Sequence, residues 1–375
     1  MGIEQALFPS PETWLARERP DEPVFFFCPR RLDEVAGRFL NGFPGLVSYA
    51  VKANPHPEMV EGLWRAGLRV FDVASPAEMA LVRARCPGAV LHYHNPVRSQ
   101  AEVMAGLAHR CVSWSVDRMS ELEKLAALPA GTEVAVRLKL PVAGAAYDFG
   151  AKFGADPAGA VALLRRVAAM GLTPSLTFHP GTQCRSAEPW ARYIHAAAEV
   201  AREAGVTLHR LNVGGGFPSD RGEGSPDLET IFATIGRATR EAFETPPALV
   251  CESGRGLCAE AVMLALKVKA VEAEAVFVND GIYGGMAEWR DLGMAGRVRV
   301  VDPAGRLRDG RAQPRIVFGP TCDSLDRLPE PMALPAAIAE GDFVICEGMG
   351  AYSGALVTGF NGYGARRVVR MSAAC

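Results

Sequence analysis

Short apolar runs rich in Val, Leu and Phe alternate with longer segments rich in Ala, Leu, Arg and Glu up to about residue 260. A first apolar run at 23–28 precedes a helical segment that reaches about residue 40. Eight further runs are predicted to be strands, at 45–53, 68–75, 89–95, 111–117, 133–140, 174–181, 208–216 and 248–255. Near-continuous apolar strands separated by helical segments indicate a parallel sheet that is covered on both faces.

Eight strand–helix units over roughly 220 residues match the size of a (β/α)8 barrel of the TIM type. A doubly wound open sheet is the structural alternative, and the count of eight favours the barrel. We therefore expect an α/β chain in which residues 29–262 form the barrel.

The pattern changes after about residue 261, where apolar runs follow one another without intervening helices. These runs lie at 263–271, 275–279, 298–302, 314–318 and 342–346, and Gly- and Pro-containing turns separate them. Successive strands with such turns predict an antiparallel β domain. We assign residues 263–375 to this domain together with residues 1–28, whose apolar run at 23–28 lies outside the eight barrel strands.

Composition limits the classes of function. The 375 residues are 49% hydrophobic and 22% charged, which is typical of globular proteins and excludes a disordered or low-complexity chain. The formal net charge of −2 gives no electrostatic reason to expect nucleic acid or an anionic membrane as a partner. The nine cysteines are an odd number, the first residues do not resemble a signal peptide, and no apolar run approaches membrane-spanning length. These features predict reduced thiols and a cytoplasmic location.

Polar residues gather where the predicted barrel strands end, which is the rim where barrel enzymes hold their active sites. Taken alone, each has an ordinary explanation, such as a solvated strand end or a flexible turn. The set comprises Lys52, Asp72, Arg137, His179, Gly214, Gly215, Gly216, Glu252 and Arg255.

Their joint placement points to one kind of chemistry. A lysine in apolar surroundings has a lowered pKa and can act as a nucleophile. A Gly-rich turn exposes backbone N–H groups that can bind a phosphate. A carboxylate beside a pyridine nitrogen keeps that nitrogen protonated. Together these are the components of a binding site for pyridoxal 5′-phosphate (PLP), and no metal ion is part of this expectation.

Four segments then resemble the motifs of fold-type III PLP-dependent decarboxylases, which are built on an alanine-racemase-like barrel with a C-terminal β domain. They are Tyr-Ala-Val-Lys-Ala-Asn at 49–54, Phe-His-Pro-Gly-Thr at 178–182, Gly-Gly-Gly-Phe-Pro at 214–218 and Glu-Ser-Gly-Arg at 252–255. The resemblance runs from about residue 23 to the C-terminus and keeps the family's order of motifs.

The C-terminal half is similar to the ornithine decarboxylase branch. The segments that carry this similarity lie at 278–284, 319–326, 349–353 and 360–363. Diaminopimelate decarboxylases carry a Glu-containing segment where Cys322 and Asp323 stand here, and that segment suits a substrate with a distal carboxylate. The resemblance thus implies a homodimeric enzyme that decarboxylates a basic L-amino acid, with L-ornithine converted to putrescine in polyamine biosynthesis.

The resemblance also implies roles for individual residues. Lys52 would form the Schiff base with PLP, Glu252 would pair with its pyridine nitrogen and His179 would stack on its ring. Asp72 and Arg137 would support this neighbourhood, and Cys322 would protonate the carbon left after CO2 departs. The phosphate would be held by Thr182, Gly216, Arg255 and Tyr352, and Gly214, Gly215 and Gly254 would also bind the cofactor. The substrate would be bound by Asp291, Asp323, Tyr283 and Phe360. In this family the residues equivalent to Cys322, Asp323 and Tyr352 come from the partner subunit.

Several alternatives stay open at this point. Arg290 could pair with Asp291 and weaken its hold on an ammonium group, so a lysine or dual lysine/ornithine decarboxylase is the close rival. A decarboxylase of a modified amino acid, a racemase and a catalytically silent regulatory homologue are further alternatives. The retention of Lys52 and Cys322 argues against the silent homologue, and the sequence Cys322-Asp323 fits decarboxylation better than racemisation.

Overall fold

The computed structural model describes residues 4–140, 152–294 and 296–372. The chain divides into two compact units, each described here by itself. The barrel unit comprises Ala36–Pro218 and Pro226–Leu257, and the sheet unit comprises Met1–Val35, Ser219–Ser225 and Cys258–Cys375. Within the described ranges, no helix combines the length and the apolar character needed to cross a bilayer.

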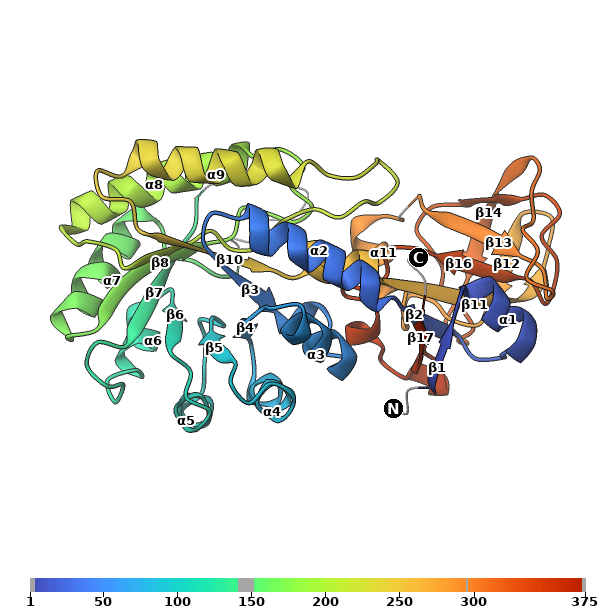
Figure 1. Ribbon diagram of the computed structural model, residues 1–375, viewed down its shortest axis with the longest axis horizontal. Coiled ribbons are helices and arrows are strands. Elements are labelled where there is room, and N and C mark those ends of the chain that lie inside the picture. The colour runs from blue at the N-terminus through green and yellow to red at the C-terminus, as the bar shows by residue number, and fades with distance from the viewer. Residues whose placement is uncertain (1–3, 141–151, 295, 373–375) are drawn as a thin grey trace. The chain divides into compact units, whose positions relative to one another are not determined.

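The barrel unit is a closed ring of eight parallel strands in the order β10-β3-β4-β5-β6-β7-β8-β9 (Figure 1). The predicted barrel is therefore confirmed. Its strands are β3 (Leu46–Ala50), β4 (Val70–Val73), β5 (Val90–Tyr93), β6 (Ser113–Val116), β7 (Glu133–Leu138), β8 (Thr173–Phe178), β9 (Arg210–Asn212) and β10 (Ala248–Ser253).

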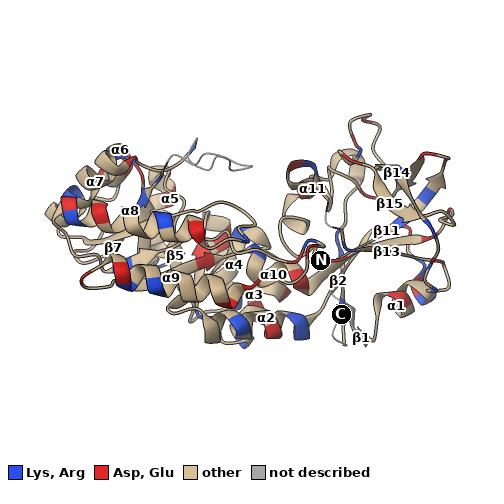
Figure 2. Ribbon diagram, turned by 90° about the horizontal axis from the view of Figure 1, so that it is seen from above, with Lys and Arg blue, Asp and Glu red and all other residues tan. Residues whose placement is uncertain are grey.

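Helices follow the barrel strands. They are α2 (Pro29–Gly42), which crosses from one unit to the other, α3 (Pro57–Arg65), α4 (Pro76–Arg85), α5 (Gln100–Ala108), α6 (Met119–Glu123), α7 (Pro157–Ala169), α8 (Glu188–Ala204), α9 (Leu228–Ala242), α10 (Arg255–Cys258) and the 3-10 turn η1 (Val51–Ala53). Ser75 and Ser99 accept backbone N–H groups at the starts of α4 and α5, which satisfies donors that a helix start leaves open. Charged positions of both signs are interspersed along α2 and α9 (Figure 2).

The strands are shorter than the apolar runs predicted, because the polar ends of those runs leave the sheet. Lys52 lies in η1 rather than in β3, and the glycine triplet lies beyond the end of β9. Gly214 and Gly216 have φ angles of 69° and 86°, which a strand does not allow and which glycine adopts most readily. The chain therefore turns at the strand ends, where the candidate site residues are found.

The sheet unit contains a nine-stranded mixed sheet whose main path runs β1-β17-β2-β11-β12-β14-β15, with β16 paired to β11 and β13. The run predicted at 23–28 does join this sheet as β2, antiparallel to β11. The strands are β1 (Glu4–Phe8), β2 (Val24–Phe27), β11 (Val262–Val271), β12 (Ala275–Val278), β13 (Val298–Val301), β14 (Ala312–Phe318), β15 (Met332–Pro335), β16 (Phe343–Cys346) and β17 (Arg367–Met371).

The sheet is mostly antiparallel, although β1 and β2 pair with β17, and β12 with β14, in parallel. Its helices are α1 (Pro11–Glu18), η2 (Ala259–Ala261), α11 (Ala287–Leu292), η3 (Gly354–Leu356) and η4 (Phe360–Gly362). A core of buried apolar side chains from α1 and several strands includes Trp14, Phe26 and Ile345.

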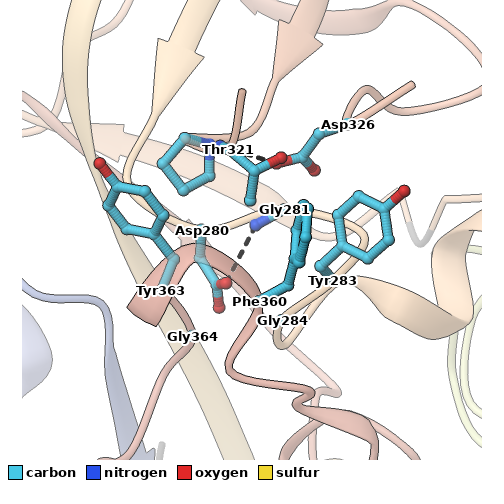
Figure 3. A pocket seen from close by; sticks show the side chains of 10 residues that line it. Asp280, Gly281, Tyr283, Gly284, Thr321, Asp326, Phe360, Tyr363 and Gly364 are labelled. Atoms are coloured by element: carbon cyan, nitrogen blue, oxygen red, sulfur yellow. Dashed lines mark hydrogen bonds between the residues drawn. The ribbon is translucent and has the colours of Figure 1, made fainter. Parts of the chain in front are cut away.

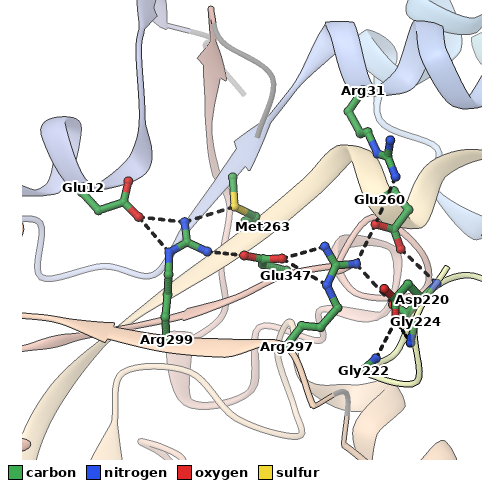
Figure 4. Close-up of polar contacts among 10 residues, drawn as sticks. All are labelled: Glu12, Arg31, Asp220, Gly222, Gly224, Glu260, Met263, Arg297, Arg299 and Glu347. Atoms are coloured by element: carbon green, nitrogen blue, oxygen red, sulfur yellow. Dashed lines mark hydrogen bonds and ion pairs between the residues drawn. The ribbon is translucent and has the colours of Figure 1, made fainter. Parts of the chain in front are cut away.

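A network of ion pairs links separate segments of the sheet unit (Figure 4). Arg297 binds Glu260 and Glu347, each through a 2.6 Å contact. Arg299 binds the same Glu347 and also Glu12, at 2.8 Å from the latter. Because several half-buried charges share partners, this network fixes the packing of these segments better than isolated surface pairs would.

Candidate active site

The glycine triplet after β9 lies where the ends of three strands meet. A Cβ atom at Gly214 would lie 2.1 Å from the carbonyl oxygen of Phe178, and one at Gly215 would lie 2.8 Å from that of Glu252. A Cβ atom at Gly216 would lie 2.7 Å from the carbonyl oxygen of Gly181. Only glycine therefore permits this close approach of the chain segments after β8, β9 and β10.

Aromatic packing behind the turn holds it in place. Phe217 is buried directly after the triplet and packs against Trp190 of α8, with ring centroids 4.9 Å apart. Phe39 of α2 and Phe232 of α9 contact Phe217 from other sides, at 5.5 and 5.7 Å. Rigid aromatic contacts of this kind fix the position of the preceding glycines, which have no side chains of their own to do so.

The loop after β8 is tied to the same turn. The N–H of Cys184 donates to the carbonyl oxygen of Gly216 at 2.9 Å, which places the segment containing Thr182 beside the triplet. After β10, a Cβ atom at Gly254 would lie 2.8 Å from the Cβ of Ala53, so Gly254 lies against the turn that contains Lys52. Arg255 begins α10 and is buried. The predicted phosphate-binding residues of the barrel unit are thus grouped around one strand end.

Lys52 differs from the sequence expectation in one respect. Its neighbours Val51 and Ala53 are buried, but its own side chain is exposed rather than enclosed in apolar surroundings. Its positive charge nevertheless acts on Asp72 and Glu252, lowering the pKa of each, and it helps to lower the pKa of His179. These four predicted residues therefore belong to one electrostatic neighbourhood.

The two carboxyl groups of this neighbourhood have opposite properties. Asp72 is 4% exposed, and burial together with the negative charge of Glu252 raises its pKa. Burial would also raise the pKa of Glu252, but the charge and hydrogen bond of His94 and the charge of Lys52 lower it. Glu252 is accordingly ionised at neutral pH, whereas Asp72 takes up a proton more easily than an ordinary aspartate.

His179 and Arg137 complete the set at the barrel rim. Burial, with the positive charges of Arg137 and Lys52, lowers the pKa of His179 to about 3, so its ring is neutral. The guanidinium carbon of Arg137 lies 5.2 Å from the centroid of the Phe153 ring, and burial lowers the pKa of Arg137. The charge of Arg137 also acts on His179.

A further group of polar residues inside the barrel was not singled out from the sequence. His92 and His94 lie near the end of β5, stacked with their ring centroids 5.3 Å apart. His94 contacts Glu252 through Nδ1, and Asn212 donates to the same carboxylate at 2.5 Å. The available signal was the alternation of two histidines in an apolar strand, which places both on one side of it.

The sheet unit brings four of the other predicted residues together, and two of them, Tyr283 and Phe360, lie side by side in Figure 3. The hydroxyl of Tyr283 donates to the carboxylate of Asp323, and the rings of Tyr283 and Phe360 lie 5.1 Å apart. The N–H of Cys322 donates to Asn361 at 3.1 Å, beside Phe360. Cys322 is exposed, whereas the other cysteines that the structure describes are buried or half-buried.

Two predicted residues of the sheet unit lie outside this group of contacts. Asp291 in α11 is held by its neighbour Arg290, whose Nε donates at 2.9 Å, so the pairing that the sequence suggested is present. The hydrogen bond and charge of Arg290 lower the pKa of Asp291. Tyr352 lies in a turn after β16 with a φ angle of 53°.

The barrel unit therefore offers an amine, an ionised carboxylate, a neutral buried imidazole and a glycine-lined turn. In addition, Oδ1 of Asp72 is buried without a hydrogen-bond partner among the residues that the structure describes. A glycine-rich turn at a strand end offers backbone N–H groups that suit a phosphate, and an ionised carboxylate suits a protonated pyridine nitrogen. These residues fit PLP, and the fold and site define a barrel enzyme that uses this cofactor.

Comparison with known proteins gives the family. Residues 30–259 match the family described as pyridoxal-dependent decarboxylase, pyridoxal binding domain. The chain is 30% identical over 332 residues to the lysine/ornithine decarboxylase of Selenomonas ruminantium, covering 84% of this chain and 81% of that protein. It is 29% identical over 353 residues to the ornithine decarboxylase of Cricetulus griseus, covering 87% and 75%.

Solved structures agree over nearly the full length. The lysine/ornithine decarboxylase of Vibrio vulnificus complexed with cadaverine superposes with a TM-score of 0.85 and 26% identity, covering 99% of this chain and 100% of that one. The complex with putrescine from the same organism gives 0.79 and 28%, covering 93% of both chains. The chain belongs to the pyridoxal-dependent decarboxylases, and it is a decarboxylase with PLP as its cofactor.

Proposed function

We propose that this enzyme removes the α-carboxylate of a basic L-amino acid and that L-ornithine is its substrate, with putrescine and CO2 as products. The observation that carries the proposal is the loop on which Cys322, a thiol, is adjacent to Asp323, an acid. A diamino acid has a second ammonium group, which needs a carboxylate wherever water is scarce. The substrates and products named for the relatives support the same class.

The residues of the barrel unit bind and orient the cofactor. The amine of Lys52 would hold PLP covalently, and the ionised carboxylate of Glu252 would favour a proton on the pyridine nitrogen. The neutral ring of His179 stacks on the cofactor. Asp72 and Arg137 contribute to the electrostatic environment of Lys52. Bound PLP supplies an electron-accepting ring, which takes up the electron pair released when the bond between Cα and the carboxylate breaks.

The phosphate is held by the turns at the ends of β8, β9 and β10. Its binding residues are Thr182, Gly214, Gly215, Gly216, Gly254, Arg255 and Tyr352. The close packing of the glycine triplet against the carbonyl oxygens of Phe178, Gly181 and Glu252 supports this assignment, because it brings the ends of β8, β9 and β10 together. Backbone N–H groups and one guanidinium suit a phosphate dianion.

The substrate's distal ammonium is bound by Asp323, with Tyr283 and Phe360 beside it. The hydrogen bond from Tyr283 fixes the orientation of the Asp323 carboxylate and lowers its pKa, which keeps it ionised. Asp291 helps to bind the distal ammonium only if the substrate displaces Arg290 from the Asp291 carboxylate. The thiol of Cys322 would supply the proton that takes the place of the carboxylate on Cα.

The active form is a cytoplasmic homodimer in which Cys322, Asp323 and Tyr352 of one subunit complete the barrel site of the other. The structure describes eight of the nine cysteines, and no disulfide joins any of these eight, which supports a reducing location. Burial raises the pKa of Cys111 and of Cys346 to about 12, so these thiols are unreactive. Among the cysteines that the structure describes, Cys322 is the exposed one, which supports its catalytic role.

A substrate panel tests the reaction. CO2 release should be measured with L-ornithine, L-lysine, L-arginine and diaminopimelate at equal concentrations. We expect the highest kcat/KM with L-ornithine and a loss of this preference in Asp323→Ala. Equal turnover of diaminopimelate would show that the role given to Asp323 is wrong. No CO2 from any of the four would favour a silent homologue or a decarboxylase of a modified amino acid.

A dual lysine/ornithine specificity is the second candidate. It is favoured by the pairing of Arg290 with Asp291, which leaves one acid rather than two to define the length of the substrate. The relative from Selenomonas ruminantium and the structure from Vibrio vulnificus both carry this dual name. Comparable kcat/KM values for L-lysine and L-ornithine would establish it in place of the ornithine-specific enzyme.

Mixing two inactive variants tests the shared site. Lys52→Ala and Cys322→Ala subunits should each be inactive, but a mixed dimer would hold one intact site. At equal proportions, we expect recovery of about a quarter of the wild-type activity. No recovery after verified subunit exchange would contradict the contribution of Cys322 across the interface.

A further inference from the structure

His94 is placed to act on the cofactor through Glu252. It directly follows β5, it is buried, and its neighbour on the same side of the strand is His92. One ring nitrogen of His92, one ring nitrogen of His94 and one carboxylate oxygen of Glu252 all lie within 4.8 Å of one another. A buried histidine at this position therefore shares a small space with the carboxylate that we assign to the pyridine nitrogen.

The contacts of His94 and Asn212 converge on a single oxygen of Glu252. Nδ1 of His94 contacts Oε1, and Nδ2 of Asn212 donates to the same Oε1 at 2.5 Å. The amide orientation of Asn212 is defined, because its Oδ1 accepts the N–H of Gly214 at 2.9 Å. Oε1 therefore acts as an acceptor for two donors, and Oε2 is the oxygen that can accept a further N–H.

Nε2 of His94 lies 2.9 Å from the hydroxyl of Ser113 on β6. A hydroxyl can donate or accept, so this contact suits both the neutral and the charged ring. Nδ1 faces Oε1 of Glu252 and also lies 3.1 Å from Nδ2 of Asn212; we assign its hydrogen to the contact with Glu252, because an ionised carboxylate can only accept. Ser113 and Glu252 thus hold the ring of His94 from both edges and fix the direction of its Nδ1–H bond.

The charges around the pair favour an ionised Glu252. Burial opposes a charge on His94, but the charge and hydrogen bond of Glu252 raise its pKa. The charged groups that act on the pair are Lys52 in η1, Asp72 in β4 and Glu133 in β7, and His92 in β5 is coupled to both members of the pair. Glu133 is itself paired with Arg210 at 2.9 Å, so its charge is largely balanced.

We propose that His94, together with Asn212, is a positioning residue that holds Oε1 of Glu252 and leaves Oε2 for the pyridine N–H of bound PLP. This inference rests on the proposed function, in which Glu252 pairs with that nitrogen. His94 does not touch the reacting atoms. It restricts the rotation of the Glu252 carboxylate, either of whose oxygens could otherwise face the pyridine nitrogen. It also stabilises the ionised form of Glu252.

The test compares PLP with an analogue whose ring nitrogen is replaced by carbon, 1-deazapyridoxal phosphate. Binding of each compound to the apoenzyme is followed by absorbance, independently of activity. In His94→Leu, we expect PLP to bind about tenfold more weakly, because one charge-assisted hydrogen bond to Glu252 is lost. The affinity for the analogue should change by less than about twofold, since it has no nitrogen for Glu252 to contact.

Two further variants separate positioning from packing. His94→Asn keeps an N–H donor close to the position of Nδ1 and should restore most of the PLP affinity. His92→Leu changes the stacked neighbour, whose two ring nitrogens are buried without a hydrogen-bond partner in the described part of the chain, and it should leave the PLP affinity unchanged. If His94→Leu fails to fold, these two variants show whether the lost N–H donor or the changed packing is the cause.

The possible failures are distinguishable. If His94→Leu weakens PLP and the analogue equally, or if His92→Leu has the same effect, the positioning role is wrong. If wild-type enzyme and Glu252→Gln both bind PLP and the analogue with equal affinity, then Glu252 does not contact the nitrogen, and that part of the proposed function fails. If Glu252→Gln abolishes the preference for PLP while His94→Leu retains it, only the present inference fails.

Discussion

Asp326 connects the two loops of the sheet unit that carry Tyr283 and the pair Cys322-Asp323 (Figure 3). It is 1% exposed, and its Oδ1 accepts the N–H of Ile282 at 3.0 Å. Its Oδ2 accepts the N–H and the hydroxyl of Thr321 at 3.1 and 2.8 Å. We predict that Asp326→Asn destabilises the fold and displaces the Cys322-Asp323 loop.

The magnitude follows from the three hydrogen bonds. An asparagine has only one carbonyl oxygen, so at least one donor among Ile282 N–H and the two of Thr321 must face an NH2 group. A hydrogen bond to a buried charged group is worth about 1.5–3 kcal/mol. The surroundings do not relax easily, because a Cβ at Gly281 or Gly319 would lie only 2.1 or 2.3 Å from an Asp326 oxygen. We expect a loss of about 3 kcal/mol in the free energy of unfolding.

Urea unfolding and steady-state kinetics provide the assay. Under the proposed function, kcat should fall because Cys322 and Asp323 move, whereas the affinity for PLP should be retained because its ring and carbonyl are bound by the barrel unit. Asp323→Asn is the matched control, since it removes a half-buried carboxylate on the same loop and should reduce activity with a smaller effect on unfolding. Unchanged unfolding of Asp326→Asn would refute the reasoning from its hydrogen bonds.

Two further predictions concern one residue in each unit. Burial raises the pKa of Asp280 from 3.8 to about 6; its stabilising contribution is therefore complete below pH 3.8 and lost as the pH rises through 6. The free energy of unfolding, measured against pH, should fall by about 3 kcal/mol less in Asp280→Asn than in the wild type. The surface variant Asp291→Asn is the control, and its pH profile should run parallel to that of the wild type. A parallel profile for Asp280→Asn would contradict the prediction. Gly215→Ala should weaken PLP binding in absorbance titrations because its Cβ would lie 2.8 Å from the Glu252 carbonyl, and the helix variant Gly37→Ala, with nothing within 4 Å, should bind PLP normally.

The sequence predicts the barrel well because its signal is repeated and local. Each buried strand is nearly all apolar, and each is followed by a helix with its own start signal, such as Ser75 before α4. The prediction is less accurate at the strand ends. Lys52 and the triplet at 214–216 lie in apolar runs, but their turns depend on contacts with other strand ends, which the local pattern does not contain.

The sheet unit shows the opposite situation. The strands β1, β15 and β17 were not predicted, because they are short or carry charged residues, as in the Arg-Val-Val-Arg-Met of Arg367–Met371. β17 is a strand because it pairs in parallel with β2, more than three hundred residues away along the chain. Pairing over such a distance leaves no periodicity that a local window can detect.

The candidate site likewise contains residues that the sequence predicts and residues that it does not. Their place at the ends of predicted strands, together with the order of the motifs, predicted Lys52, His179 and Glu252 as site residues, and the pKa relations among them bring them into one electrostatic neighbourhood. His94 escaped notice because its role depends on a carboxylate from β10, across the barrel interior from β5. A histidine in an apolar strand is ambiguous until its partner is known, so the residues that tune a carboxylate are harder to find from sequence than the carboxylate itself.

The proposed function assigns two kinds of control over one reaction to separate groups of residues. Glu252, whose Oε1 is held by His94 and Asn212 within the barrel unit, is proposed to set the protonation of the cofactor. Asp326 and Tyr283 govern the placement of Cys322 and Asp323 from within the sheet unit. If the two act independently, the double variant should show the PLP affinity of His94→Leu and the fractional loss of kcat of Asp326→Asn, each unchanged by the other substitution. A non-additive result would mean that the substrate loops sense the charge state of the cofactor site.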